Sequence, residues 1–148
     1  MKHLGAEASL ADLPSGSCCR FHLFQDKDGA FTRASFVSDE FSHLSDNAIT
    51  WRVTPLLLDE GKIHVAWQIP EVRNYNGDME RPPDIGQSVL RVTNATKVWK
   101  GDAQVKLTDL AIGDELLTNL SGERPGSPSH ATAIWTGEDT HQRLRKRK

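Results

Sequence analysis

The feature that most constrains the fold of this chain is a glycine-terminated step between short strands at residues 98–120, VWKGDAQVKLTDLAIGDELLTNL. The first part predicts a strand, a tight turn and a second strand, and residues 115–120 predict a third strand with alternating faces. Residues 107–113 lie between them and predict a short helical or turn-like step. This succession is typical of a small β-barrel and does not by itself indicate a reaction.

The residues of the step have separate expected roles. Thr108 or Asp109 can cap the amides of one short turn. Leu110 and Ile112 are expected to point into the core. Gly113 is expected to hold the positive φ that redirects the backbone, because only glycine adopts it without a steric penalty.

A similar segment lies near the N-terminus, where residues 5–16 read GAEASLADLPSG beside GDAQVKLTDLAIG at 101–113. Both run from Gly through a polar turn to Leu, a small residue, Asp-Leu, two further residues and Gly. The second copy is one residue longer before its Leu. We interpret the pair as an internal repeat of one β unit, with related halves at 1–70 and 86–136; chance similarity in a common turn is the alternative.

The pattern Leu-x-Asp-Leu-x-x-Gly-Asp at 107–114, preceded by Thr96-Lys97-Val98, resembles a step in OB-like small β-barrel bacterial domains of unknown function. The self-splicing Hint fold carries a similar step, but Met1 is not the Cys or Ser nucleophile that a Hint domain requires. The resemblance implies a barrel-like fold and no particular activity.

Alternating apolar residues predict the strands, most clearly at 62–69, where one face is apolar and the other polar. We expect an all-β fold, OB-like or a paired small β-barrel, with about eight or nine strands and one short helix near 38–45 capped by Ser38. The expected core is Phe21, Leu23, Ile49, Trp51, Val53, Ile63, Val65, Trp67, Leu90, Val92, Leu110 and Leu116.

The chain of 148 residues favours one domain, here 1–140, followed by a basic mobile tail at 141–148. The net charge of −2 argues against a nucleic-acid partner. No apolar run is long enough for a membrane span, and residues 1–11 lack a signal-peptide core. We therefore expect no membrane partner and, by default, a cytoplasmic location. The adjacent Cys18 and Cys19 offer no ordinary disulfide.

Metal binding is one alternative function, and no other cofactor is predicted. Cys18 and His22 share a strand face but would lie about 13 Å apart at roughly 3.3 Å per residue, too far for one ion. Asn76, Asp78 and Glu80 present oxygens at alternate positions, as calcium loops do, but without flanking helices. Buried cysteine and a polar surface loop are the simpler interpretations.

A second alternative is a hydrolase that uses paired loop carboxylates, Asp78, Glu80 and Asp84. None of the six histidines lies in a recognisable catalytic motif, so the sequence favours a protein that is not an enzyme. Trp51 and Trp99 stand beside basic residues and could form a base-stacking platform, but core packing is the simpler interpretation.

The leading hypothesis is a non-enzymatic binding or interaction module for an unknown protein or small molecule. Its expected binding surface is the long connection at 71–86, because long irregular loops in compact domains are usually functional or disordered. The candidate residues combine adaptable apolar and charged groups: Arg73, Tyr75, Asp78, Met79, Glu80 and Arg81. The alternative is a structural loop in which Tyr75 and Ile85 plug the barrel end.

Overall fold

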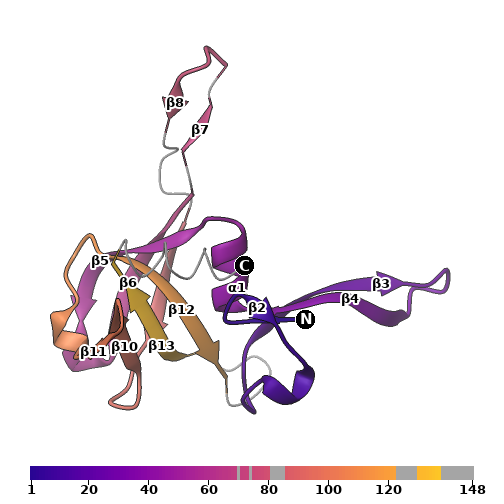
Figure 1. Ribbon diagram of the computed structural model, residues 1–148, viewed down its shortest axis with the longest axis horizontal. Helices are drawn as coiled ribbons and strands as arrows, with labels where there is room; N and C mark the ends of the chain where they lie inside the picture. The colour runs from indigo at the N-terminus through magenta and orange to yellow at the C-terminus, as the bar shows by residue number, and fades with distance from the viewer. Residues whose placement is uncertain (70, 74, 81–85, 123–129, 138–148) are drawn as a thin grey trace.

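The computed structural model describes residues 1–69, 71–73, 75–80, 86–122 and 130–137. Its main body is a closed barrel of five strands, which confirms the predicted all-β class (Figure 1). The barrel strands are β5 (Thr50–Leu57), β6 (Lys62–Gln68), β9 (Gln87–Arg91), β12 (Glu115–Ser121) and β13 (His130–Thr136).

Four antiparallel pairings and one parallel contact close this barrel. β13 pairs with β12, β12 with β5, β5 with β6 and β6 with β9. The circle is completed by one parallel pair, His130 with Arg91. This pair joins the last residue of β9 to the first residue of β13.

Two more strands extend the sheet beyond β13. β10 (Lys97–Lys100) runs parallel to β13, and β11 (Ala103–Val105) forms a hairpin with β10. The 3-10 helix η2 (Leu58–Glu60) connects β5 to β6 and ends at Gly61, which has φ of 64°.

The barrel interior is filled by the alternating apolar residues of its strands. Ten residues of the predicted core are confirmed as buried or as packed against the buried cluster: Ile49, Trp51, Val53, Ile63, Val65, Trp67, Leu90, Val92, Leu110 and Leu116. The prediction is wrong for Phe21 and Leu23, which are 52% and 46% exposed. Their strand lies outside the barrel, so no second sheet of the described chain packs over them.

The predicted step is a 3-10 helix, η3 (Leu107–Asp109). Asp109 accepts a hydrogen bond from the Lys106 amide, 2.8 Å away, and thereby closes the turn. Gly113 has φ of 94°, as expected. Leu110 is buried, but Ile112 is 71% exposed, because the turn to Gly113 points its side chain into solvent.

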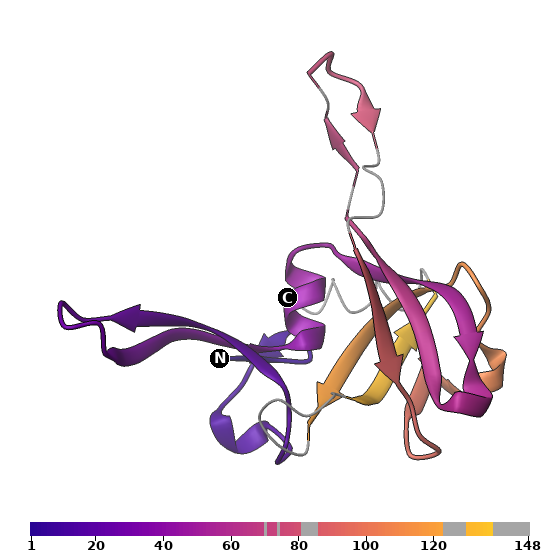
Figure 2. The same cartoon turned by 180° about the vertical axis from the view of Figure 1, so that it is seen from behind.

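The N-terminal residues form a separate four-stranded sheet in the order β2-β1-β4-β3. Its strands are β1 (Lys2–His3), β2 (Ala6–Glu7), β3 (Cys19–Gln25) and β4 (Phe31–Asp39), with the 3-10 helix η1 (Leu10–Asp12) between β2 and β3. The β3–β4 hairpin extends away from the barrel (Figure 2). Its turn contains Gly29 at positive φ, 82°.

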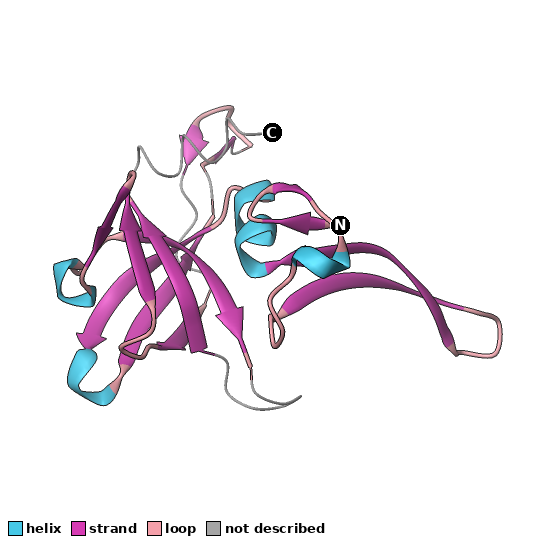
Figure 3. Ribbon diagram, turned by 60° about the horizontal axis from the view of Figure 1, so that its bottom comes forward, coloured by secondary structure: helices cyan, strands magenta, loops and turns pink. Residues whose placement is uncertain are grey.

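One α-helix, α1 (Glu40–Asp46), lies between this sheet and the barrel (Figure 3). It begins later than the predicted 38–45, because the capping side chain is Asp39 and not Ser38. The Asp39 carboxylate accepts from the Ser42 amide at 2.8 Å. Phe41 and Leu44 are fully buried and attach the helix to the core.

The connection at 71–86 contains regular structure, contrary to the prediction of an irregular loop. β7 (Val72–Arg73) and β8 (Met79–Glu80) pair in an antiparallel hairpin, which we call the β7–β8 arm. The described residues form thirteen strands, of which nine remain when the two-residue strands β1, β2, β7 and β8 are set aside, within the expected eight or nine.

Candidate functional site

The β7–β8 arm extends from the barrel in both views (Figures 1 and 2). Arg73 pairs with Met79 across the two strands, and Gly77 supplies the positive φ, 89°, of the connecting turn. The arm is therefore a built hairpin that presents the residues between its strands at a distance from the barrel.

Most candidate binding residues lie together on this arm. Tyr75 is fully exposed and Met79 is 58% exposed. Arg73, Asp78 and Glu80 are exposed beside them. Arg81 lies outside the described residues. The exposure of Tyr75 contradicts its expected role as a plug of the barrel end, and Ile85, the other expected plug, lies outside the described residues.

A second exposed apolar surface lies on the β3–β4 hairpin, and sequence reasoning missed it. Phe21, Leu23, Phe24 and Phe31 are all exposed there. The guanidinium of Arg33 lies 4.6 Å from the centre of the Phe24 ring, a cation–π contact on the opposite side of the sheet from Phe21. The alternation of apolar residues was visible in the sequence, but it was interpreted as a sign of burial.

A buried polar cluster around Asp39 holds the N-terminal sheet against α1 and β12. Its carboxylate accepts from the Leu4 amide at 3.0 Å, from Asn119 Nδ2 at 2.9 Å and from the Ser42 amide, and it lies 2.7 Å from His3 Nδ1. Asn119 Oδ1 in turn accepts from the Phe41 amide. These partners come from β1, its turn, α1 and β12, so one side chain connects all of them.

An ion pair beside this cluster connects the β3–β4 hairpin to α1. Arg20 donates from Nε and Nη2 to the two carboxylate oxygens of Glu40, at 2.9 and 3.1 Å. This bond to Glu40 raises the pKa of Arg20. Desolvation lowers the pKa of the neighbouring His43, and the positive charge of Arg20 adds to the effect. Burial raises the pKa of Cys19, so its thiol is poorly suited to act as a nucleophile.

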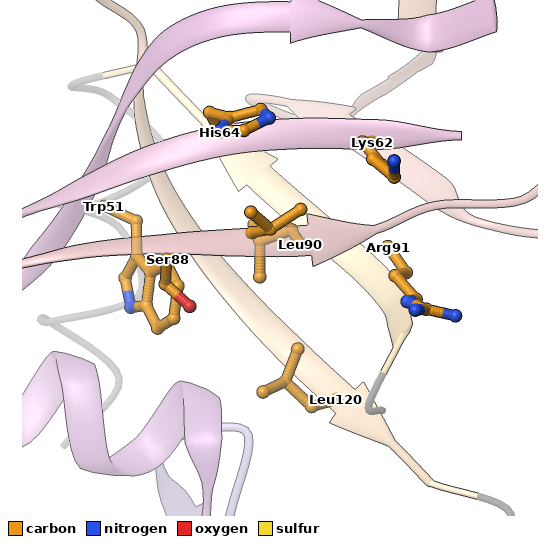
Figure 4. Close-up of a pocket in the computed structure, with 8 residues that line it drawn as sticks. Trp51, Lys62, His64, Ser88, Leu90, Arg91 and Leu120 are labelled. Atoms are coloured by element: carbon orange, nitrogen blue, oxygen red, sulfur yellow. The ribbon is translucent and has the colours of Figure 1, made fainter. Parts of the chain in front are cut away.

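A groove with a volume of about 500 Å³ lies along β9. Leu90 of β9 and Leu120 of β12 lie on its two sides, with Trp51 toward one end and Arg91 toward the other (Figure 4). The indole Nε1 of Trp51 is buried without a hydrogen-bond partner among the described residues. His64 and Ser88 add polar groups, and the lining holds no carboxylate.

The metal candidates do not form a cluster. Cys18 precedes β3 and His22 lies within it, while Asn76, Asp78 and Glu80 belong to the β7–β8 arm. No group of three His, Cys, Asp or Glu side chains that could hold an ion occurs among the described residues. Asp84, the third carboxylate of the hydrolase alternative, lies outside them.

The tryptophans contribute mainly to packing. Trp51 is buried, and its ring centre lies 5.5 Å from that of Trp67. Trp135 packs edge-on against Phe41 at 4.7 Å. A buried Trp51 cannot stack on a base, whereas the other platform candidate, Trp99, is only partly buried.

Comparisons with protein-family models, curated proteins and solved structures found no match for this chain. Within the ranges that the structure describes, no helix has the length and apolar character needed to cross a membrane.

Proposed function

We propose that this protein is a non-enzymatic interaction module that binds a partner protein through the β7–β8 arm. The observation that carries the proposal is the exposure of Tyr75 and Met79 on a hairpin that extends from the barrel. Aromatic residues and methionine are enriched in protein interfaces, where they supply large contact area.

The charged residues of the arm suit the rim of such a contact. Arg73 and Glu80 are exposed on the two strands and flank the apolar pair. Charged groups at the rim contribute mainly to specificity and association rate, while buried aromatic anchors contribute most of the affinity. The hairpin pairing also limits the freedom of the arm, which reduces the entropy lost on binding.

The test replaces Tyr75 and Met79 together with Ala. Because both side chains are exposed, the melting temperature should stay within about 2 °C of the wild type, which corresponds to a surface change of about 0.5 kcal/mol. Partners enriched by the tagged wild-type protein in quantitative affinity purification should be lost from the double variant.

A matched control replaces two apolar residues exposed elsewhere, Leu10 and Ile112, with Ala. This control should keep every partner of the wild type. If the Tyr75/Met79 variant keeps the same partners as the control, or if it unfolds, the arm is not the binding surface.

A further inference from the structure

Two parts of the chain have the same strand arrangement. We call β1–β4 the N-terminal unit and β10–β13 the C-terminal unit. Their strand orders are β2-β1-β4-β3 and β11-β10-β13-β12. In each unit the first strand forms a hairpin with the second and runs parallel to the fourth, while the third and fourth are antiparallel.

The residue pairing of the two units is also the same, related by one constant shift in residue number. Each has a register shift at the matching place, between His22 and Leu23 in one and between Asn119 and Leu120 in the other. The pair Cys19–Asp39 matches Leu116–Thr136. Likewise, Phe21–Val37 matches Thr118–Ile134, and Phe24–Arg33 matches Ser121–His130.

The connections match under the same shift. The first turns have positive φ at Leu4, 50°, and Gly101, 63°, and each unit then has a 3-10 helix followed by a glycine at positive φ, Gly16 or Gly113. An Asp closes each 3-10 helix by accepting from the amide three residues earlier. Leu4 therefore corresponds to Gly101, so no extra residue is needed in the alignment of the two segments.

The units differ in what covers one face. In the C-terminal unit, Leu116, Thr118 and Ile134 face the barrel interior and are fully buried, because β5, β6 and β9 complete the barrel over them. The matching residues of the N-terminal unit are Cys19, Phe21 and Val37. Phe21 is more than half exposed, and Cys19 and Val37 are only partly buried.

We propose that this face of the N-terminal unit is half of a second barrel interior, completed by a three-stranded antiparallel β-meander from a partner polypeptide. The shared arrangement specifies the occupant: a sheet like β5-β6-β9, apolar at alternate positions on the side that faces Phe21 and Leu23. A second copy of this chain is not the occupant, because its own β5, β6 and β9 already close its barrel.

The backbone limits where the meander can pair. The residues just before β3 are already bonded to the end of β12 and the residue after it: the Cys18 amide donates to the Leu120 carbonyl at 2.9 Å, and the Gly122 amide donates to the Gly16 carbonyl at 3.0 Å. The incoming edge strand must therefore pair with β3 beyond Cys18. Beyond Cys18, no other strand of the described chain pairs with the outer edge of β3.

The experiment supplies a meander of known sequence. Residues 48–92 of this chain, which contain β5, β6 and β9, are fused through a Gly/Ser linker ahead of Met1 of the full chain, and amide hydrogen exchange is measured in β3. Docking should slow exchange at 20–25 by at least tenfold. A matched fusion carries Cys19→Leu and Phe21→Thr in the N-terminal unit, which gives β3 the residues that β12 has on this face.

A control fusion carries Val53→Asp and Val65→Asp in the added segment only, on the face that should contact Phe21. Protection of β3 in either fusion, absent from the control, supports the proposal. Protection in neither fusion, or equal protection in the control, overturns it. A dimer of the unfused chain that Phe21→Ser/Leu23→Ser abolishes would show that a second copy is the occupant, and also overturns it. The added segment brings a second copy of the β7–β8 arm, but no arm residue is substituted in any fusion and the readout is amide exchange in β3, so this result is independent of the proposed function.

Discussion

Asp39 is the residue whose loss should disturb the most elements at once. It is 2% exposed and accepts hydrogen bonds from α1, the first turn and β12. Asp39→Ala removes the helix cap and leaves several buried donors without a partner, so the free energy of unfolding should fall by about 2–4 kcal/mol. Urea denaturation followed by tryptophan fluorescence measures this.

Asp59→Ala is the matched control, because Asp59 is exposed at the start of η2. It should change the free energy of unfolding by no more than about 0.5 kcal/mol. Equal effects of the two substitutions would show that the Asp39 cluster is not a principal contact.

Gly113 gives a second prediction at the same scale. A Cβ added there would meet no atom within 4 Å, so the whole cost of Gly113→Ala comes from φ of 94°. We expect a loss of about 1 kcal/mol in the free energy of unfolding. Gly86→Ala is the control, since Gly86 also has open space and lacks a positive φ. If Gly113→Ala left the melting temperature unchanged, this explanation of the turn would be wrong.

At the scale of elements, the first hairpin turn has a residue that does not suit it. Leu4 has φ of 50° and is followed by Gly5 at 78°, so both central residues are left-handed, as in a type I′ turn. Asn tolerates this conformation better than Leu, and Asn-Gly is the preferred pair. Leu4→Asn should therefore raise the free energy of unfolding by about 0.5–1 kcal/mol. A melting temperature lower for Leu4→Asn than for the wild type would contradict this prediction.

The strands also show what could be predicted from sequence. Alternation located β6 closely and placed Ile63 and Val65 in the core, because both faces of a barrel strand have fixed environments. The same alternation misplaced Phe21 and Leu23, because a period of two shows which face is apolar and not whether another sheet covers it. The β7–β8 arm was located as a candidate site, but two-residue strands give no periodic signal, so its hairpin was missed.

For the whole molecule, we expect stability to be uneven. The barrel strands bury a continuous core, whereas the β3–β4 hairpin and the β7–β8 arm expose most of their residues. Native-state amide exchange in the unmodified chain should therefore be at least tenfold faster at the tips of both hairpins than in β6 and β12, because local opening exposes little apolar surface there. Equal protection across all these strands would mean that the hairpins are not independent of the barrel.

The pairing of β13 has a consequence for how the chain folds as it is synthesised. This strand contacts β9, β10 and β12, and among the described strands it is the last to leave the ribosome. The N-terminal unit and α1 are complete long before it, but the barrel cannot close until residues 130–136 emerge. The nascent chain must therefore hold the apolar faces of β5, β6 and β9 open to solvent from the emergence of β9 until residues 130–136 follow, and chaperones that shield exposed β-sheet would act during that interval.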